Sequence, residues 1–255
     1  MPDLPTQIRY HLEALKAAGV EYLPRPKLTL AIRTTAEPPP RLVVNPELPI
    51  SAESSLPTVA PAVDRRVQLE QLADEVAKCD RCPELFSTRT QTVFGAGPLS
   101  PELCFVGEAP GAEEDKSGLP FVGPAGQLLT KIIAAMGFTR EEVYICNTLK
   151  CRPPMNRTPT PRECANCRGF FERQLDLVSP KYICCLGAVA AQNVLESKLS
   201  IGKLRGRFYE YRGIPVLCTY HPSYLLRDPS KKKDCWEDMK LLLRRMGRPI
   251  PGGGK

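Results

Sequence analysis

The chain has 255 residues, enough for one medium-sized domain with an additional segment. Hydrophobic residues make up 42% and charged residues 25%, as in ordinary globular proteins, and the net charge of +7 suits a polyanionic partner without requiring one. No apolar stretch approaches the length of a membrane span, and the first residues lack the pattern of a signal peptide. We therefore expect a cytoplasmic protein without membrane segments.

The N-terminal quarter differs in character from the rest. Residues 6–18 predict a short amphipathic helix, which Thr6 can cap and Gly19 can end. Residues 24–64 are rich in proline and have little hydrophobic periodicity, which is typical of an extended linker, although a loop packed on the core is the alternative. We expect residues 1–64 to form a largely flexible N-terminal extension and residues 249–255 a flexible tail.

From residue 65 onward, predicted strands and helices alternate. The predicted strands are 103–106, 143–147, 182–186 and 216–220, and the predicted helices are 68–77, 126–135, 161–177, 188–195 and 236–245. Alternation of this kind predicts an α/β fold in which a central four-stranded, mainly parallel sheet carries helices on both faces. We assign this domain to residues 65–248.

Polar residues and glycines follow each predicted strand. The segments concerned are 107–111 with Glu113, Glu114 and Asp115 behind it, then Asn147, Gly187, and the run His221-Pro222-Ser223. Because ligands bind at the carboxyl ends of the strands in open parallel sheets, these residues are predicted to meet in one crevice.

The residue types in this crevice suit a nucleobase. The amide of Asn147 offers a donor beside an acceptor, His221 can stabilise a developing oxyanion, and Phe121 can stack on a planar ring. Each has a simpler interpretation: Asn147 as a turn cap, His221 as a structural histidine and Phe121 as a core residue. Only the set, placed at successive strand ends, favours a ligand site.

Eleven cysteines are many for this length, and a cytoplasmic chain does not keep disulfides. Five are expected to be buried small hydrophobes in the strands: Cys104, Cys146, Cys184, Cys185 and Cys218. Cys235 has no predicted role. The remaining five form two C-x-x-C pairs and a single residue, namely Cys79 and Cys82, Cys164 and Cys167, and Cys151. Their spacing fits either Zn²⁺ or an iron–sulfur cluster.

An ordered set of motifs adds a specific resemblance. They are Cys79-x-x-Cys82, the segment 107–115 (GEAPGAEED), the segment 118–123 (GLPFVG), Asn147-x-x-x-Cys151-Arg152-Pro153-Pro154-x-Asn156-Arg157, and His221-Pro222-Ser223. In this order the chain resembles the family 4 uracil-DNA glycosylases, from about Cys79 to Leu243. Residues 1–64 lie outside the resemblance.

The resemblance implies a three-layer α/β/α fold and a structural [4Fe-4S] cluster. The spacing of the family's ligands selects Cys79, Cys82, Cys151 and Cys167 and leaves Cys164 unused. The cluster would brace the loops that grip DNA and would carry out no redox chemistry.

The resemblance also implies a monofunctional hydrolase of base excision repair, which flips uracil out of single- or double-stranded DNA and cleaves its glycosidic bond without lyase activity. Glu108, Ala109 and Pro110 would line the pocket and Phe121 would stack on the uracil. Asn147 would pair with the uracil edge and exclude cytosine, while His221 would stabilise charge on the uracil O2. We expect Glu108, Asn147 and His221 to be the catalytic residues.

Residues outside the pocket are expected to hold the DNA, and a monomer is the default expectation. Leu225 and Arg227 would enter the gap left by the flipped base, with Ser223 and Arg157 as further DNA contacts. Other candidates for phosphate contacts are Lys150, Arg152, Arg205, Arg207 and Lys231 to Lys233.

The group that activates water is open. The best-known uracil glycosylases carry an aspartate where this chain has Ala109, so Glu108 is the first candidate and Glu114 the second, unless stabilisation of the uracil anion suffices. A related branch traps DNA covalently through a histidine in the loop after the asparagine motif. Residues 152–161 contain no histidine, which predicts ordinary turnover.

Two other functions compete with this hypothesis. A non-catalytic DNA-binding module with a metal or cluster would keep the cysteines and basic loops but would not need Asn147 or His221. A nucleotide-binding α/β enzyme would need a phosphate-cradling glycine motif, which the sequence lacks.

Overall fold

The computed structural model describes residues 62–251. The predicted helix over 6–18 and most of the proline-rich segment lie outside the described residues. The strands are β1 (Leu103–Gly107), β2 (Tyr144–Asn147), β3 (Tyr182–Leu186), β4 (Phe208–Tyr211) and β5 (Ile214–Thr219). The α-helices are α2 (Ala62–Ala77), α3 (Pro83–Thr88), α4 (Ala112–Ser117), α5 (Pro124–Ala135), α6 (Pro161–Val178), α7 (Ala188–Leu195), α8 (Ile201–Leu204), α9 (Pro222–Arg227) and α10 (Lys232–Arg245).

The strands form one sheet in the order β2-β1-β3-β5-β4. The four predicted strands are parallel to one another, which confirms the mainly parallel sheet. The prediction of four strands was one short, because β4 adds an antiparallel edge beside β5. Arg212 and Gly213 make the tight connection between these two strands, with φ angles of 49° and 80°. Two successive left-handed residues are the geometry of a two-residue hairpin turn.

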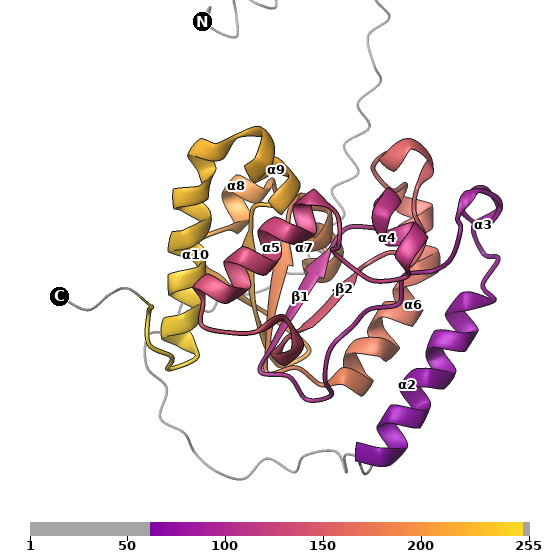
Figure 1. Cartoon of the computed structure of the whole chain (residues 1–255), viewed down its shortest axis with the longest axis horizontal. Coiled ribbons are helices and arrows are strands. Elements are labelled where there is room, and N and C mark those ends of the chain that lie inside the picture. The colour runs from indigo at the N-terminus through magenta and orange to yellow at the C-terminus, as the bar shows by residue number, and fades with distance from the viewer. Residues whose placement is uncertain (1–61, 252–255) are drawn as a thin grey trace, which may run out of the picture. The chain divides into compact units, whose positions relative to one another are not determined.

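Helices cover both faces of the sheet, so the three-layer arrangement is present (Figure 1). One face packs against α6, α7 and α8 through residues such as Phe171, Leu175 and Val194. The other face packs against α5 and α10 through residues such as Leu129 and Leu242. Every residue of β1 and β2 is buried. Strand β1 lies inside the sheet with both faces covered, and Ala96 pairs with Ile145 on the outer side of the edge strand β2.

Successive residues of each strand point to opposite cores. In β3, for example, Cys184 packs on the α5 and α10 side and Cys185 on the α6 and α7 side. The five strand cysteines are all buried, which confirms their interpretation as small core residues, and Cys235 of α10 is buried as well. At the C-terminal end, Ile250 packs against the α5 and α10 core. Among the described helices, none is long and apolar enough to cross a membrane.

Candidate active site

A cavity of about 870 Å³ lies at the carboxyl ends of the parallel strands. Most of the residues predicted for the site line it: Glu108, Ala109, Pro110, Phe121, Asn147, Arg157, His221, Ser223 and Arg227. The segments come from four different strand ends, as the position of ligand sites in parallel sheets requires. Sequence alternation alone therefore located the cavity.

Asn147 ends β2 and lies opposite Gly107, the last residue of β1. A Cβ at position 107 would be 2.3 Å from the Asn147 Oδ1 and 2.4 Å from the Phe121 Cζ. Glycine is therefore needed here, because any side chain would displace the two residues that face the cavity. The Asn147 Oδ1 is buried and has no hydrogen-bond partner among the described residues. An unpaired buried acceptor costs about 1–3 kcal/mol, so its retention indicates a partner from outside the chain.

A strained turn presents Phe121 to the cavity. Its φ is 53°, a left-handed value that is uncommon for a bulky residue. The turn is held by Glu114, whose Oε1 accepts from the N–H groups of Val122 and Gly123 at 2.9 Å each. The Glu114 Oε2 also accepts from the Gly111 N–H at 3.1 Å. Glu114 is thus occupied in shaping the turn, and strain of this kind is often stored at functional sites.

His221 begins α9 and caps it with its own ring. The His221 Nδ1 accepts from the Ser223 N–H at 3.1 Å and lies 2.8 Å from the Ser223 hydroxyl. Because an acceptor nitrogen carries no proton, the neutral ring has its proton on Nε2. Burial, with a smaller contribution from the nearby positive charge of Arg227, lowers the pKa of His221 to about 4. The ring is therefore neutral at pH 7 and lies 5.7 Å from the Phe121 ring, centroid to centroid.

The two candidate water-activating groups have different surroundings. Glu108 follows β1 and lines the cavity, and burial raises the pKa of its carboxyl. A raised pKa brings a carboxylate closer to the strength needed of a general base near neutral pH. Glu114 also lines the cavity, but both of its oxygens already accept hydrogen bonds from the backbone. The geometry therefore favours Glu108.

Helices α5 and α7 both begin at the cavity, which their first residues Pro124 and Ala188 line. Helix N-termini carry partial positive charge and favour nearby negative charge. Gly187, directly before α7, leaves room for His221: a Cβ there would lie 2.9 Å from the His221 Cβ, and its φ is 90°. The two helix N-termini suit a ligand that gains negative charge, and Gly187 allows His221 to lie beside that ligand site.

The leucine expected to enter DNA does not fit that role. Leu225 of α9 points into the protein interior and is only 1% exposed. Leu226, one position later, is 45% exposed and lines the cavity. Tyr224, which the sequence interpretation also missed, lines the cavity from the same helix. The helical turn after Pro222 could have been predicted from proline at a first helical position, but which leucine faces outward depends on packing.

Several predicted phosphate contacts have other partners. Lys150 is fully buried and its Nζ donates to the carbonyl oxygens of Phe94 and Asn147 and to the side chain of Gln174. It cannot reach DNA, and the prediction is wrong for this residue. Arg205 binds Asp238 in a partly buried ion pair. A charged residue in a sequence carries no sign of such burial.

The five cysteines of the two C-x-x-C pairs and Cys151 lie near one another around α3 and the start of α6. Of these, Cys82, Cys151, Cys164 and Cys167 share one hydrophobic cluster. Burial raises the pKa of Cys151, and the neighbouring thiols of Cys79 and Cys82 raise it further. Burial likewise raises the pKa of Cys167 to about 12, with Cys151 and Cys79 among its neighbours. Burial raises the pKa of Cys164 as well, but the side chain that hydrogen-bonds to it is Asn193.

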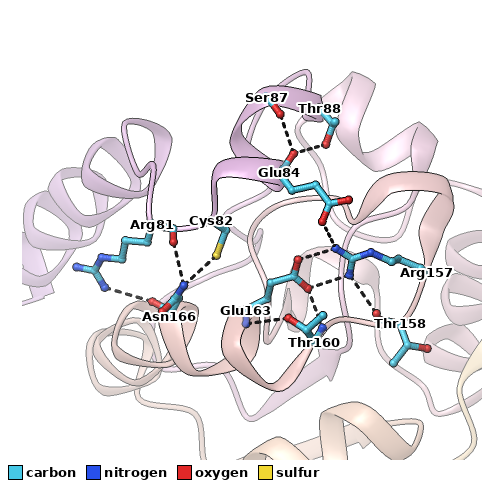
Figure 2. A network of polar contacts seen from close by, with 10 residues as sticks. All are labelled: Arg81, Cys82, Glu84, Ser87, Thr88, Arg157, Thr158, Thr160, Glu163 and Asn166. Carbon is cyan, nitrogen blue, oxygen red and sulfur yellow. Dashed lines mark hydrogen bonds and ion pairs between the residues drawn. The ribbon is translucent and has the colours of Figure 1, made fainter.

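Polar side chains point at two of these sulfurs. The Arg89 guanidinium donates to the Cys151 Sγ at 3.0 Å, and the Asn166 amide donates to the Cys82 Sγ at 3.3 Å. Figure 2 shows Asn166 and Cys82 beside a second network. In that network Arg157 forms ion pairs with Glu163 and Glu84, both at 2.7 Å. Arg157 therefore joins α3 to the start of α6.

Within residues 62–251, no three His, Cys, Asp or Glu side chains converge on a point where they could hold one metal ion. A four-iron cluster is wider than a single ion, and its thiolate ligands surround it at separate corners.

Comparison with known proteins agrees with this fold. Residues 94–240 match the model of the uracil DNA glycosylase superfamily. A type-4 uracil-DNA glycosylase of Thermotoga maritima is 48% identical over 170 residues, covering 66% of this chain and 88% of that protein. A type-4 enzyme of Archaeoglobus fulgidus is 40% identical over 191 residues, covering 72% of this chain and 96% of that protein. A type-5 uracil-DNA glycosylase of Pyrobaculum aerophilum is 28% identical over 188 residues.

The fold and the cavity define a three-layer α/β protein with a ligand site at its strand ends. The chain belongs to the uracil DNA glycosylase superfamily and, within it, to the type-4 uracil-DNA glycosylases. The resemblance seen in the sequence motifs is thereby confirmed.

Proposed function

We propose that this chain excises uracil from DNA by hydrolysing the N-glycosidic bond, which leaves an abasic site for base excision repair. The observation that carries the proposal is the unpaired, buried Asn147 Oδ1 at the wall of the cavity. It supplies a hydrogen-bond acceptor that has no partner among the described residues, as recognition of a ligand N–H requires.

Uracil supplies the matching edge. Its N3–H would donate to the Asn147 Oδ1, and its O4 would accept from the Asn147 Nδ2. Cytosine has no proton on N3 and an amine in place of O4, so the same amide would face an acceptor with its oxygen and a donor with its nitrogen. Phe121 would cover one face of the flipped uracil ring. Gly107 has no side chain and so leaves room for the Phe121 ring.

Bond cleavage sends the electron pair of the C1′–N1 bond to the uracil ring, where the charge spreads to O2. The neutral His221 would donate its Nε2–H to that oxygen, since Nδ1 is held as an acceptor by Ser223. The N-termini of α5 and α7 would stabilise the same charge. The sugar, left with a deficit of electrons at C1′, takes up water.

Glu108 is the proposed acceptor of the proton from that water. Its carboxyl lines the cavity, and its raised pKa makes it a stronger base than an exposed glutamate. That proton then passes from Glu108 to the departing uracil anion, so the products are neutral uracil and a 1′-hydroxyl on the abasic sugar. Ala109, also at the wall, contributes shape without a titratable group.

We further propose that Cys79, Cys82, Cys151 and Cys167 hold a structural [4Fe-4S] cluster. Two observations support the fit: the mutual influence of these thiols, and the donors Arg89 and Asn166 on two of the sulfurs. Four thiolates held close together at partly buried positions are unfavourable without a positively charged partner, and an iron–sulfur core supplies one. Its chemistry here is structural, because the cysteines tie the end of α2, the start of α3 and α6 to the loop after β2.

DNA would reach the cavity from its open rim. Leu226 takes over the role first predicted for Leu225 and would fill the space vacated by the flipped nucleotide, with Ser223 and Arg227 beside it. Use of single- or double-stranded DNA, a monomeric state and a cytoplasmic location stay predictions.

A comparison of binding with excision tests this function. In the His221→Ala variant we expect excision of uracil to fall by about 10²- to 10³-fold, the usual cost of removing one oxyanion donor. Binding to a uracil-containing oligonucleotide should remain close to that of the native chain. Equal excision by both proteins, or no excision by the native chain with intact binding, would instead favour the non-catalytic DNA-binding module.

A further inference from the structure

Met155 is the most exposed large apolar side chain in the described part of the chain, at 94% exposure. It lies at the tip of the loop between Cys151 and α6, in the short helix η2 (Pro154–Asn156). Its φ is 53°, and that of Asn156 is 55°. A left-handed backbone favours glycine or asparagine over a bulky side chain. A fully exposed methionine held in this conformation, between residues that line the cavity, is therefore a candidate contact residue.

The loop that carries Met155 is held in place before any partner binds. Two consecutive prolines, Pro153 and Pro154, fix its entry, and the Pro153 and Pro154 carbonyls accept from the N–H groups of Asn156 and Arg157 at 3.0 and 3.1 Å. The Arg152 Nε donates to the Asn156 Oδ1 at 2.8 Å. A contact residue on a preformed loop loses little conformational freedom on binding.

The base of the loop is fixed as well. Figure 2 shows Arg157 between Glu163 of α6 and Glu84 of α3, with Thr158 beside it. The Arg157 NH1 and NH2 groups donate to both oxygens of Glu163, at 2.9 and 2.7 Å. A two-pronged pair of this kind fixes direction as well as distance. Met155 therefore projects from a support anchored on two helices.

The position of the loop relates it to the cavity. Pro153, Asn156 and Arg157, on either side of Met155 in the chain, all line the cavity. The other exposed apolar residue of this rim is Leu226 of α9. The two come from different parts of the fold, since η2 packs against α3 whereas α9 packs against α5. The rim thus carries two apolar side chains from independent supports.

We propose that Met155 is a second DNA-contacting wedge, which packs on the base beside the flipped uracil while Leu226 fills the vacated position. The inference rests on the proposed function. Methionine is among the apolar side chains that proteins insert against base steps, and its flexible thioether adapts to any base. Because it acts on stacked neighbours of the uracil, its effect should be large on duplex DNA and small on a single strand.

The test compares Met155→Ala with Val67→Ala, a control at another exposed apolar residue, which lies on α2 outside the cavity lining. We expect Met155→Ala to bind a duplex containing a tetrahydrofuran abasic analogue about tenfold more weakly, the equivalent of one partly buried apolar side chain. The rate of uracil excision from a single strand should stay within about twofold of the native rate, and Val67→Ala should match the native chain on both substrates.

Two further variants separate the side chain from the loop. Met155→Gly suits the left-handed backbone and should lose as much duplex affinity as Met155→Ala, while Met155→Leu should retain most of it. Native duplex affinity in Met155→Ala and Met155→Gly, in an enzyme that excises uracil, would overturn this inference alone. Failure of the native chain to excise uracil from either substrate would overturn the proposed function and this inference with it.

Discussion

The strand-end cavity and the cysteine region are built in different ways. The cavity takes its residues from the register of a sheet with covered faces, as the pairing of Gly107 with Asn147 illustrates. The cysteine region joins separate chain segments through polar side chains such as Arg89, Asn166 and Arg157. The first is therefore determined by the fold, whereas the second depends on specific charges and, as we propose, on a bound cluster. Variants in the two regions should fail in different ways.

The largest effect is expected from loss of a proposed cluster ligand. Cys151→Ser should abolish the brown colour of the purified protein and lower its stability by several kcal/mol, because metal-site binding energy contributes directly to folding. Cys164→Ser is the matched control, since Cys164 shares the hydrophobic cluster but is not a proposed ligand. Iron content and thermal unfolding measure both. Loss of iron from Cys164→Ser together with full iron in Cys151→Ser would reverse the assignment.

A second change acts on the cavity alone. Gly107→Ala places a Cβ 2.3 Å from the Asn147 Oδ1, so the amide must move and its hydrogen bonds to the uracil edge are lost. A well-formed pair of base-edge hydrogen bonds contributes about 1–3 kcal/mol, so we expect uracil excision to fall by about 10²-fold at normal iron content. Gly169→Ala, where the added methyl meets no atom within 4 Å, is the control. Unchanged excision by Gly107→Ala would contradict the assigned role of Asn147.

A moderate loss of stability is expected at the anchor between α3 and α6. The Arg157 guanidinium lowers the pKa of Glu163 to about 2, so the native pair persists well into acid. Glu163→Gln should lower the free energy of unfolding by about 1.5 kcal/mol, measured with urea at pH 7. Glu75→Gln breaks a solvent-exposed pair with Arg173 and should lower the free energy of unfolding clearly less than Glu163→Gln does. Equal losses in both variants would mean that the anchor is no stronger than a surface ion pair.

The smallest effect concerns the pH response of His221. Its native pKa of about 4 is below the ordinary value of about 6.5. Between these values the unfolded chain takes up a proton that the native ring refuses, so this residue makes stability rise as pH increases from about 4 to 6.5 and adds no dependence above that range. NMR titration of the imidazole nitrogens tests this, with His11→Gln used to assign the signals. A midpoint near 6.5 for His221 would contradict a desolvated, neutral ring.

The sequence was informative where topology decides the outcome. The strands of a parallel sheet deliver their carboxyl ends to one edge, so Asn147 and His221 could be placed together without any side-chain geometry. Hydrophobic periodicity also separated the long helices from the strands. The edge strand β4 was not predicted, because its four residues, two of them tyrosines, give only a weak hydrophobic alternation. The Arg212-Gly213 turn that follows it could have indicated a hairpin.

Side-chain direction and pairing could not be predicted in the same way. Leu225 and Leu226 differ by one position on a helix, and only packing against the core decides which is buried. Lys150 looks like a surface lysine in the sequence, yet in the interior it donates to two acceptors from distant segments, Phe94 and Gln174, and to the carbonyl of nearby Asn147. Glu114 looked like a catalytic carboxylate until three backbone N–H groups were found to occupy it. Such roles depend on contacts between residues far apart in the chain.

The central claim is that the cavity removes uracil from DNA. Its most direct test is incubation of the iron-loaded protein with an oligonucleotide carrying a single deoxyuridine, followed by alkali, which breaks the strand at an abasic site. We predict a cut at the uracil position and none in a matched oligonucleotide with cytosine there. An intact uracil strand after incubation with the iron-loaded protein would contradict the account.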